Sequence, residues 1–151
     1  MKELKYDFYV GGTPEQVWES LISPEMVKQI YYGSVIRSSF QIGERFEYVG
    51  PGAEGPETLH VFGTLLELTP QKALRFTHKV GPSYLKGGEN HESRISWLLE
   101  PVGGCTKLTL LHDEWHPDDP SYGPSDNAWP QIMSNIKTLV ETGRTLDFGS
   151  F

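Results

Sequence analysis

Near its carboxyl end the chain reads Asp126-Asn-Ala-Trp-Pro-Gln-Ile-Met-Ser-Asn-Ile-Lys-Thr-Leu-Val-Glu-Thr-Gly143. The large apolar side chains of this segment recur every three or four residues, at Trp129, Ile132, Met133, Ile136, Leu139 and Val140. That spacing places them in one stripe along a helix, with polar residues on the other face. Asp126 or Asn127 is expected to cap the helix, with Pro130 in its first turn and Gly143 at its end. It is the only long helix that the sequence predicts.

Most of the remaining chain is predicted to form strands. Their expected ranges are 3–10, 34–40, 44–49, 57–68, 72–80, 92–100 and 105–113. Two short helices are expected after the first strand, because Thr13-Pro14-Glu15-Gln16 and Ser23-Pro24-Glu25 are typical helix starts. Segments 51–56 and 116–125 are rich in Pro and Gly and are expected to be irregular. Strands without alternating helices indicate an antiparallel sheet in an α+β fold, with residues 1–151 as one domain.

The composition argues against some classes of function. Of 151 residues 37% are hydrophobic and 22% charged, as in ordinary globular proteins. The net charge of −7 and the lack of a basic cluster argue against nucleic-acid binding and against binding to anionic membranes. We find no signal-like start and no apolar run long enough to span a bilayer, and Cys105 is the single cysteine. These features predict a cytoplasmic protein.

Four motifs, in this order, resemble one family. They are Thr13-Pro14-Glu15-Gln16-Val17-Trp18, Gly63 to Pro70, Gly103 to Leu110 followed by His112, and Trp129-Pro130 leading to Gly143. Together they resemble the START-like or Bet v 1-like (SRPBCC) superfamily, in the branch named for the C-terminal domain of the activator of Hsp90 ATPase. The resemblance implies a helix-grip, in which a seven-stranded antiparallel sheet wraps around the long C-terminal helix. The family's frequent tryptophan pair is replaced here by Tyr31-Tyr32.

A single helix does not fill a wide curved sheet, so we expect a pocket between them. The alternation of side chains along a strand places Ile95, Trp97 and Leu99 on the sheet face that contacts the helix. The family resemblance implies that residues 74, 76 and 78 lie on the same face. Such an apolar and aromatic set with a few polar groups is typical of a small-molecule site. The candidate ligand-binding residues are Tyr31, Tyr32, Phe76, His78, Trp97, Leu110, His112, Trp129, Met133 and Ile136. The alternative interpretation is that each of them only packs the core.

Three further functions are weighed against ligand binding. His60, His78 and His112 lie on neighbouring strands but lack a metal-binding spacing, so neither a metal nor another cofactor is expected. A polyketide cyclase-like enzyme would use His112, His78 or Glu67 for acid–base chemistry, since alternation also places Glu67 on the inner face. The family resemblance also suggests a chaperone-interacting module. The sequence therefore favours a binding protein for an apolar, aromatic or lipid-like molecule, leaving the ligand and the oligomeric state open.

The entrance to the pocket is expected between two segments. The loop 81–90 holds three glycines and few apolar anchors, and Tyr31-Tyr32-Gly33 should lie at the same end of the sheet. Tyr31, Tyr32 and Tyr84 are then expected to act as movable aromatic lids.

Overall fold

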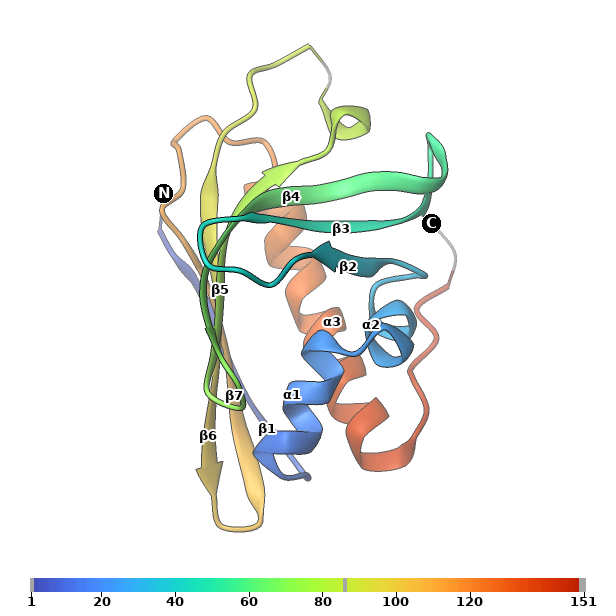
Figure 1. The fold of residues 1–151 in the computed structure, drawn as a ribbon, viewed down its shortest axis with the longest axis vertical. Coiled ribbons are helices and arrows are strands. Elements are labelled where there is room, and N and C mark those ends of the chain that lie inside the picture. Colours follow the sequence, from blue (N-terminus) through green and yellow to red (C-terminus); the bar gives the residue numbers. More distant parts are fainter. Residues whose placement is uncertain (1, 86, 150–151) are drawn as a thin grey trace.

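The computed structural model describes residues 2–85 and 87–149, and within them seven strands form one antiparallel sheet (Figure 1). The order across the sheet is β1-β7-β6-β5-β4-β3-β2. The strands are β1 Leu4–Val10, β2 Val35–Ser38, β3 Arg45–Gly52, β4 Gly55–Thr69, β5 Ala73–Val80, β6 Ser93–Val102 and β7 Cys105–Asp113. The helices are α1 Pro14–Ile22, α2 Pro24–Ile30, the single 3-10 turn η1 Pro82–Tyr84, and α3 Tyr122–Thr142. The predicted α+β fold is confirmed.

The sheet curves around α3, which lies on its concave side (Figure 1). The buried face of α3 carries Trp129, Met133, Ile136 and Leu139, as the apolar stripe predicts. These four residues belong to one core cluster with the inner face of the sheet. Bulges in the β3–β4 and β4–β5 pairs add twist to the strands that bend over the helix. The arrangement is a helix-grip.

Strand alternation correctly assigned the inner face of β6 and β7, and the family resemblance correctly assigned that of β5. Phe76 pairs with Ile95, and Ile95 pairs with His112, so these three side chains lie in one row across the sheet. The next row contains Leu74, Trp97 and Leu110. All six side chains are buried.

The first short helix has the expected capping box, in which Thr13 and Gln16 exchange side-chain to backbone hydrogen bonds.

The start of α3 differs from the prediction. The helix begins at Tyr122, so Pro124 is its third residue and Pro130 lies in its interior. Pro124 is tolerated because the first N–H groups of a helix have no intrahelical acceptor. Pro130 leaves the carbonyl of Asp126 without its usual donor; the hydroxyl of Tyr6 lies 3.4 Å from that carbonyl and donates to the Asp126 carboxylate. The extra turn lies outside the apolar stripe, which is why periodicity missed it.

Two strand predictions were also wrong. Residues 51–56 do not form a separate loop, because β3 runs to Gly52 and β4 starts at Gly55. Pro51 is compatible with this extension since β2 pairs with β3 only as far as Val49. Glu67 was expected on the inner face, but a bulge between Leu65 and Glu67 reverses the alternation. Glu67 therefore faces away from α3.

Within the described ranges 2–85 and 87–149, no helix has the length and apolar character needed to cross a bilayer.

Candidate functional site

A cavity of about 620 Å³ lies between α3 and the sheet. It is bounded by the end of α2, the strands β3 to β6, the turn η1 and the first half of α3. The lining residues are Tyr31, Tyr32, Ser34, Tyr48, Pro51, Gly52, His60, Val61, Phe76, His78, Tyr84, Ile95, Pro124, Ser125, Ala128, Trp129, Gln131 and Ile132. Its volume lies within the range of sites that hold small organic molecules, roughly 300–1,000 Å³.

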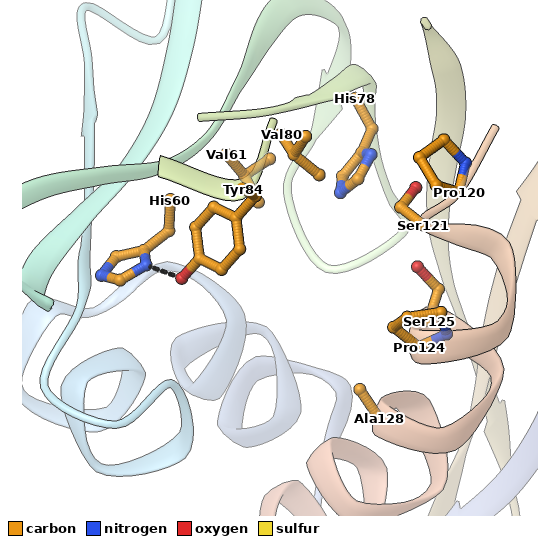
Figure 2. Close-up of a pocket in the computed structure, with 10 residues that line it drawn as sticks. All are labelled: His60, Val61, His78, Val80, Tyr84, Pro120, Ser121, Pro124, Ser125 and Ala128. Carbon is orange, nitrogen blue, oxygen red and sulfur yellow. Dashed lines mark hydrogen bonds between the residues drawn. The ribbon is translucent and has the colours of Figure 1, made fainter. Parts of the chain in front are cut away.

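A smaller recess of about 350 Å³ shares seven of these residues and extends toward the start of α3. Figure 2 shows this part, with His60, Tyr84 and His78 on one side and Pro124, Ser125 and Ala128 of α3 on the other. The extra first turn of α3 therefore supplies one wall of the recess.

The lining is aromatic and carries no formal charge. Six residues are Tyr, Phe or Trp, and two are His. Among the described residues that line the cavity there is no Asp, Glu, Lys or Arg. A mostly apolar concave surface with a few directed polar groups is the usual composition of a small-molecule site.

The structure divides the ten candidate residues into two groups. Tyr31, Tyr32, Phe76, His78 and Trp129 line the cavity. The other five are almost fully buried in the core behind this wall and do not line it: Trp97, Leu110, His112, Met133 and Ile136. Sequence reasoning missed the β3–β4 hairpin and the first turn of α3, both of which it treated as irregular. A stricter test for helix-compatible prolines in the segment 116–125 would have found the latter.

A buried chain of hydrogen bonds lies behind the cavity wall. The indole Nε1 of Trp129 lies 3.0 Å from Nδ1 of His112, and Nε2 of His112 lies 2.8 Å from Oγ of Ser93. Ser93 Oγ lies 3.4 Å from Nδ1 of His78. Ser93 can reach both histidines because it pairs with His78 across the β5–β6 ladder, next to the pair of Ile95 with His112.

Trp129 determines which groups donate and which accept in this series of hydrogen bonds. An indole N–H is only a donor, so Nδ1 of His112 accepts and its Nε2 carries the proton of the neutral ring. His112 then donates to Ser93, whose own proton is available to Nδ1 of His78 across the longer 3.4 Å contact. With Nδ1 accepting from Ser93, the neutral ring of His78 carries its proton on Nε2. Figure 2 shows the His78 ring projecting from β5 into the recess.

Burial keeps four titratable groups in and behind the cavity wall uncharged. It lowers the pKa of His78 to about 4, against an opposing effect of the nearby Asp119 carboxylate. Burial and the adjacent His78 together lower the pKa of His112 to about 2. The pKa values of Tyr31 and Tyr48 are raised by burial, and their hydroxyls are hydrogen-bonded to each other. At neutral pH all four groups are in their neutral forms.

The two expected entrance segments both reach the cavity, since Tyr31, Tyr32 and Tyr84 line it. Tyr32 and Tyr84 are 44% and 50% exposed, whereas Tyr31 stacks on Tyr48 with ring centroids 4.8 Å apart. The loop 81–90 has more anchors than expected, although its residue 86 lies outside the described ranges. Tyr84 hydrogen-bonds Nδ1 of His60, and Asn90 donates to the carbonyl of Val80 over 2.9 Å.

Of the three acid–base candidates, only His78 lines the cavity. His112 is fully buried behind it, and Glu67 pairs with Arg75 on the other face, with 2.9 Å between Arg75 Nε and Glu67 Oε1. The described part of the chain contains no group of three or more His, Cys, Asp or Glu side chains placed to hold a metal ion. The polar chemistry available inside the cavity is therefore hydrogen bonding by His60, His78, the amide of Gln131 and a few hydroxyls.

The buried histidines predict a stability that falls in acid. Their folded-state pKa values lie below the unfolded value of about 6.5, so only the unfolded chain takes up these protons as the pH falls below about 6.5. Each histidine should cost about 1.4 kcal/mol per pH unit until its folded pKa is reached. Urea unfolding of His78→Gln between pH 7 and pH 4.5 should show a slope smaller by about that amount. An unchanged slope in His78→Gln would contradict the neutral assignment.

Comparison with known proteins gives one family and a consistent fold. The family model described as activator of Hsp90 ATPase homolog 1-like protein matches residues 12–141. No curated protein sequence gives a significant match. Among solved structures, the protein MLL2253 from Mesorhizobium loti is similar at TM-score 0.75 and 19% identity, over 93% of this chain and 97% of that one.

Two further structures are similar at lower identity. PFC0360w, an HSP90 activator from Plasmodium falciparum, has TM-score 0.71 and 16% identity, over 93% of this chain and 97% of that one. DynU16, a protein of the dynemicin biosynthetic locus, has TM-score 0.71 and 18% identity; the match covers 100% of this chain but 56% of that one. These likenesses concern the fold.

Proposed function

This chain belongs to the family of activator of Hsp90 ATPase homolog 1-like proteins. Because an aromatic cavity lies between its long helix and the sheet, we propose that it is a binding protein for an apolar aromatic small molecule. The observation that carries the proposal is the cavity of about 620 Å³, with six aromatic side chains and no charged one among its described lining residues. A helix that only completed a core would leave less space against the sheet, because protein interiors are close-packed. We place this binding in the cytoplasm, where the exposed thiol of Cys105 would remain reduced.

The ligand itself can be found by a stability screen. A molecule that binds only the folded state at 100 times its dissociation constant stabilises the protein by about 2.7 kcal/mol, which raises the melting temperature by several degrees. Libraries of flavonoid-like, polyketide-like and lipid-like compounds should contain such molecules. Binding should also quench tryptophan fluorescence, because Trp129 lines the cavity and its ring contacts Trp97 edge-on at 5.6 Å.

A variant that fills the cavity supplies the control. Ala128 lines both parts of the cavity, so Ala128→Trp should abolish the shift and the quenching without unfolding the protein. Asn127→Trp adds the same side chain at the exposed neighbouring position and should bind as wild type does. Equal binding by both variants would place the ligand elsewhere, and no shift with any compound class would contradict the proposal.

A second candidate is an enzyme of the polyketide cyclase type. His78 favours it, since an imidazole N–H facing an apolar cavity can polarise a carbonyl oxygen. The similarity to DynU16, of a biosynthetic locus, is compatible with this role. Consumption of a bound compound that depends on His78 would separate this candidate from binding alone. A chaperone-interacting role, as for the Plasmodium falciparum relative, would instead be indicated by stoichiometric recovery of Hsp90 in a pull-down.

A further inference from the structure

We infer that the cavity selects an uncharged ligand that presents a hydrogen-bond acceptor, such as a ketone oxygen, to the Nε2–H of His78. This inference rests on the proposed binding function and specifies the chemical class of its ligand. It stands on two features of the site, the uncharged lining and the chain of hydrogen bonds that begins at the indole donor of Trp129.

The uncharged lining disfavours an anionic ligand. A carboxylate moved from water into this cavity would lose its hydration without meeting a Lys or Arg among the described lining residues. The shifted pKa values of His78, Tyr31 and Tyr48 report the same property, since burial drives each of these groups to its neutral form. The site that keeps its own side chains neutral imposes the same cost on the charge of a ligand.

The dipole at the start of α3 favours an anion, and a carboxylate already lies there. Asp119 is buried, and its Oδ1 accepts from the backbone N of Ser121 at 2.9 Å and from the Ser121 hydroxyl at 2.7 Å. Its charge offsets the positive end of the helix dipole. Asp119 also lies close enough to His78 to affect its pKa. An anionic ligand at this end would therefore be repelled.

The hydrogen-bond chain makes His78 a donor toward the ligand. The indole N–H of Trp129 can only donate, which sets the tautomer of His112. His112 then donates to Ser93, and the Ser93 proton is available to Nδ1 of His78. The remaining ring nitrogen, Nε2, belongs to a residue on the cavity wall and bears the proton. A ligand oxygen with no proton of its own satisfies this donor, while an apolar group at the same place leaves it unpaired.

A matched set of three ligands tests the inference. Naphthyl methyl ketone, ethylnaphthalene and naphthoate, substituted at the same ring position, have similar size but offer a neutral acceptor, no acceptor and an anion. Their affinities for wild type, His78→Leu and His78→Gln would be measured by calorimetry at neutral pH. Naphthoate should bind at least about 100-fold more weakly than the ketone. The ratio of ketone to ethylnaphthalene affinity should fall about fivefold in His78→Leu and be retained in His78→Gln, whose amide keeps an N–H donor.

The outcomes separate this inference from the proposed function. Similar affinities of wild type for the ketone and naphthoate would overturn the charge selection while leaving small-molecule binding intact. A ketone to ethylnaphthalene ratio that is the same in wild type and His78→Leu would overturn the role of His78. This second comparison needs a folded His78→Leu, whereas the first uses wild type alone. Failure of all three ligands to bind wild type would count against the proposed function and hence against the inference.

Discussion

Replacing Ile136 by Asp is expected to unfold most of the protein at room temperature. Ile136 is fully buried at the centre of the face that α3 turns to the sheet. Loss of its side chain from a packed core costs about 2–5 kcal/mol, and burial of an unpaired carboxylate adds to this cost. The sum approaches the whole stability of a typical domain, about 5–15 kcal/mol. Circular dichroism with urea unfolding would measure the change.

The matched control for this variant is Asn127→Asp, which places the same carboxylate on the exposed face of the same helix. It should alter the unfolding free energy by less than about 0.5 kcal/mol. An Ile136→Asp protein that melts within a degree or two of wild type would show that a different face of α3 is buried.

Replacing Gly63 by Ala is the second change with a large expected effect. A Cβ at this position would lie 1.9 Å from the backbone oxygen of Thr77 and 2.5 Å from its carbonyl carbon. Backbone atoms of a paired strand cannot move aside without separating β4 from β5, so we expect a loss of about 3 kcal/mol or more in unfolding free energy. His78 follows Thr77 directly, and any surviving folded protein should also bind ligand more weakly.

Gly104→Ala is the corresponding control, since nothing lies within 4 Å of a Cβ built there. Its unfolding free energy should be close to that of wild type. Equal stabilities of Gly63→Ala and Gly104→Ala would show that β4 and β5 do not approach as closely as described.

The parts of this fold that follow a simple period were predictable. The stripe from Trp129 to Val140 and the inward residues of β6 and β7 are set by burial, which repeats regularly along the sequence. The predictions were wrong where a local irregularity interrupted the regular spacing of apolar residues. The bulge after Leu65 turned Glu67 outward, and the tolerance of a first helical turn for proline allowed α3 to start at Tyr122.

The candidate site was less predictable because it depends on register. Ser93 has no motif around it, and only the pairing of β5 with β6 places it between His78 and His112. Similarly, Ala128 and Tyr84 come together across the recess from distant parts of the chain. Alternation assigns a residue to a face of the sheet, but it does not say whether that residue meets a cavity or another side chain.

The most direct test of the central claim is native mass spectrometry of the protein purified, without denaturation, from the cell that makes it. We expect a population heavier than the bare chain by the mass of one small molecule, which is released when the protein is unfolded. The cavity-filling variant Ala128→Trp, made in the same cell, should show only the bare mass, because its added side chain occupies the space between α3 and the sheet. A wild-type protein that carries no added mass, and gains none from any compound class offered to it, would contradict the claim that this grip holds a ligand.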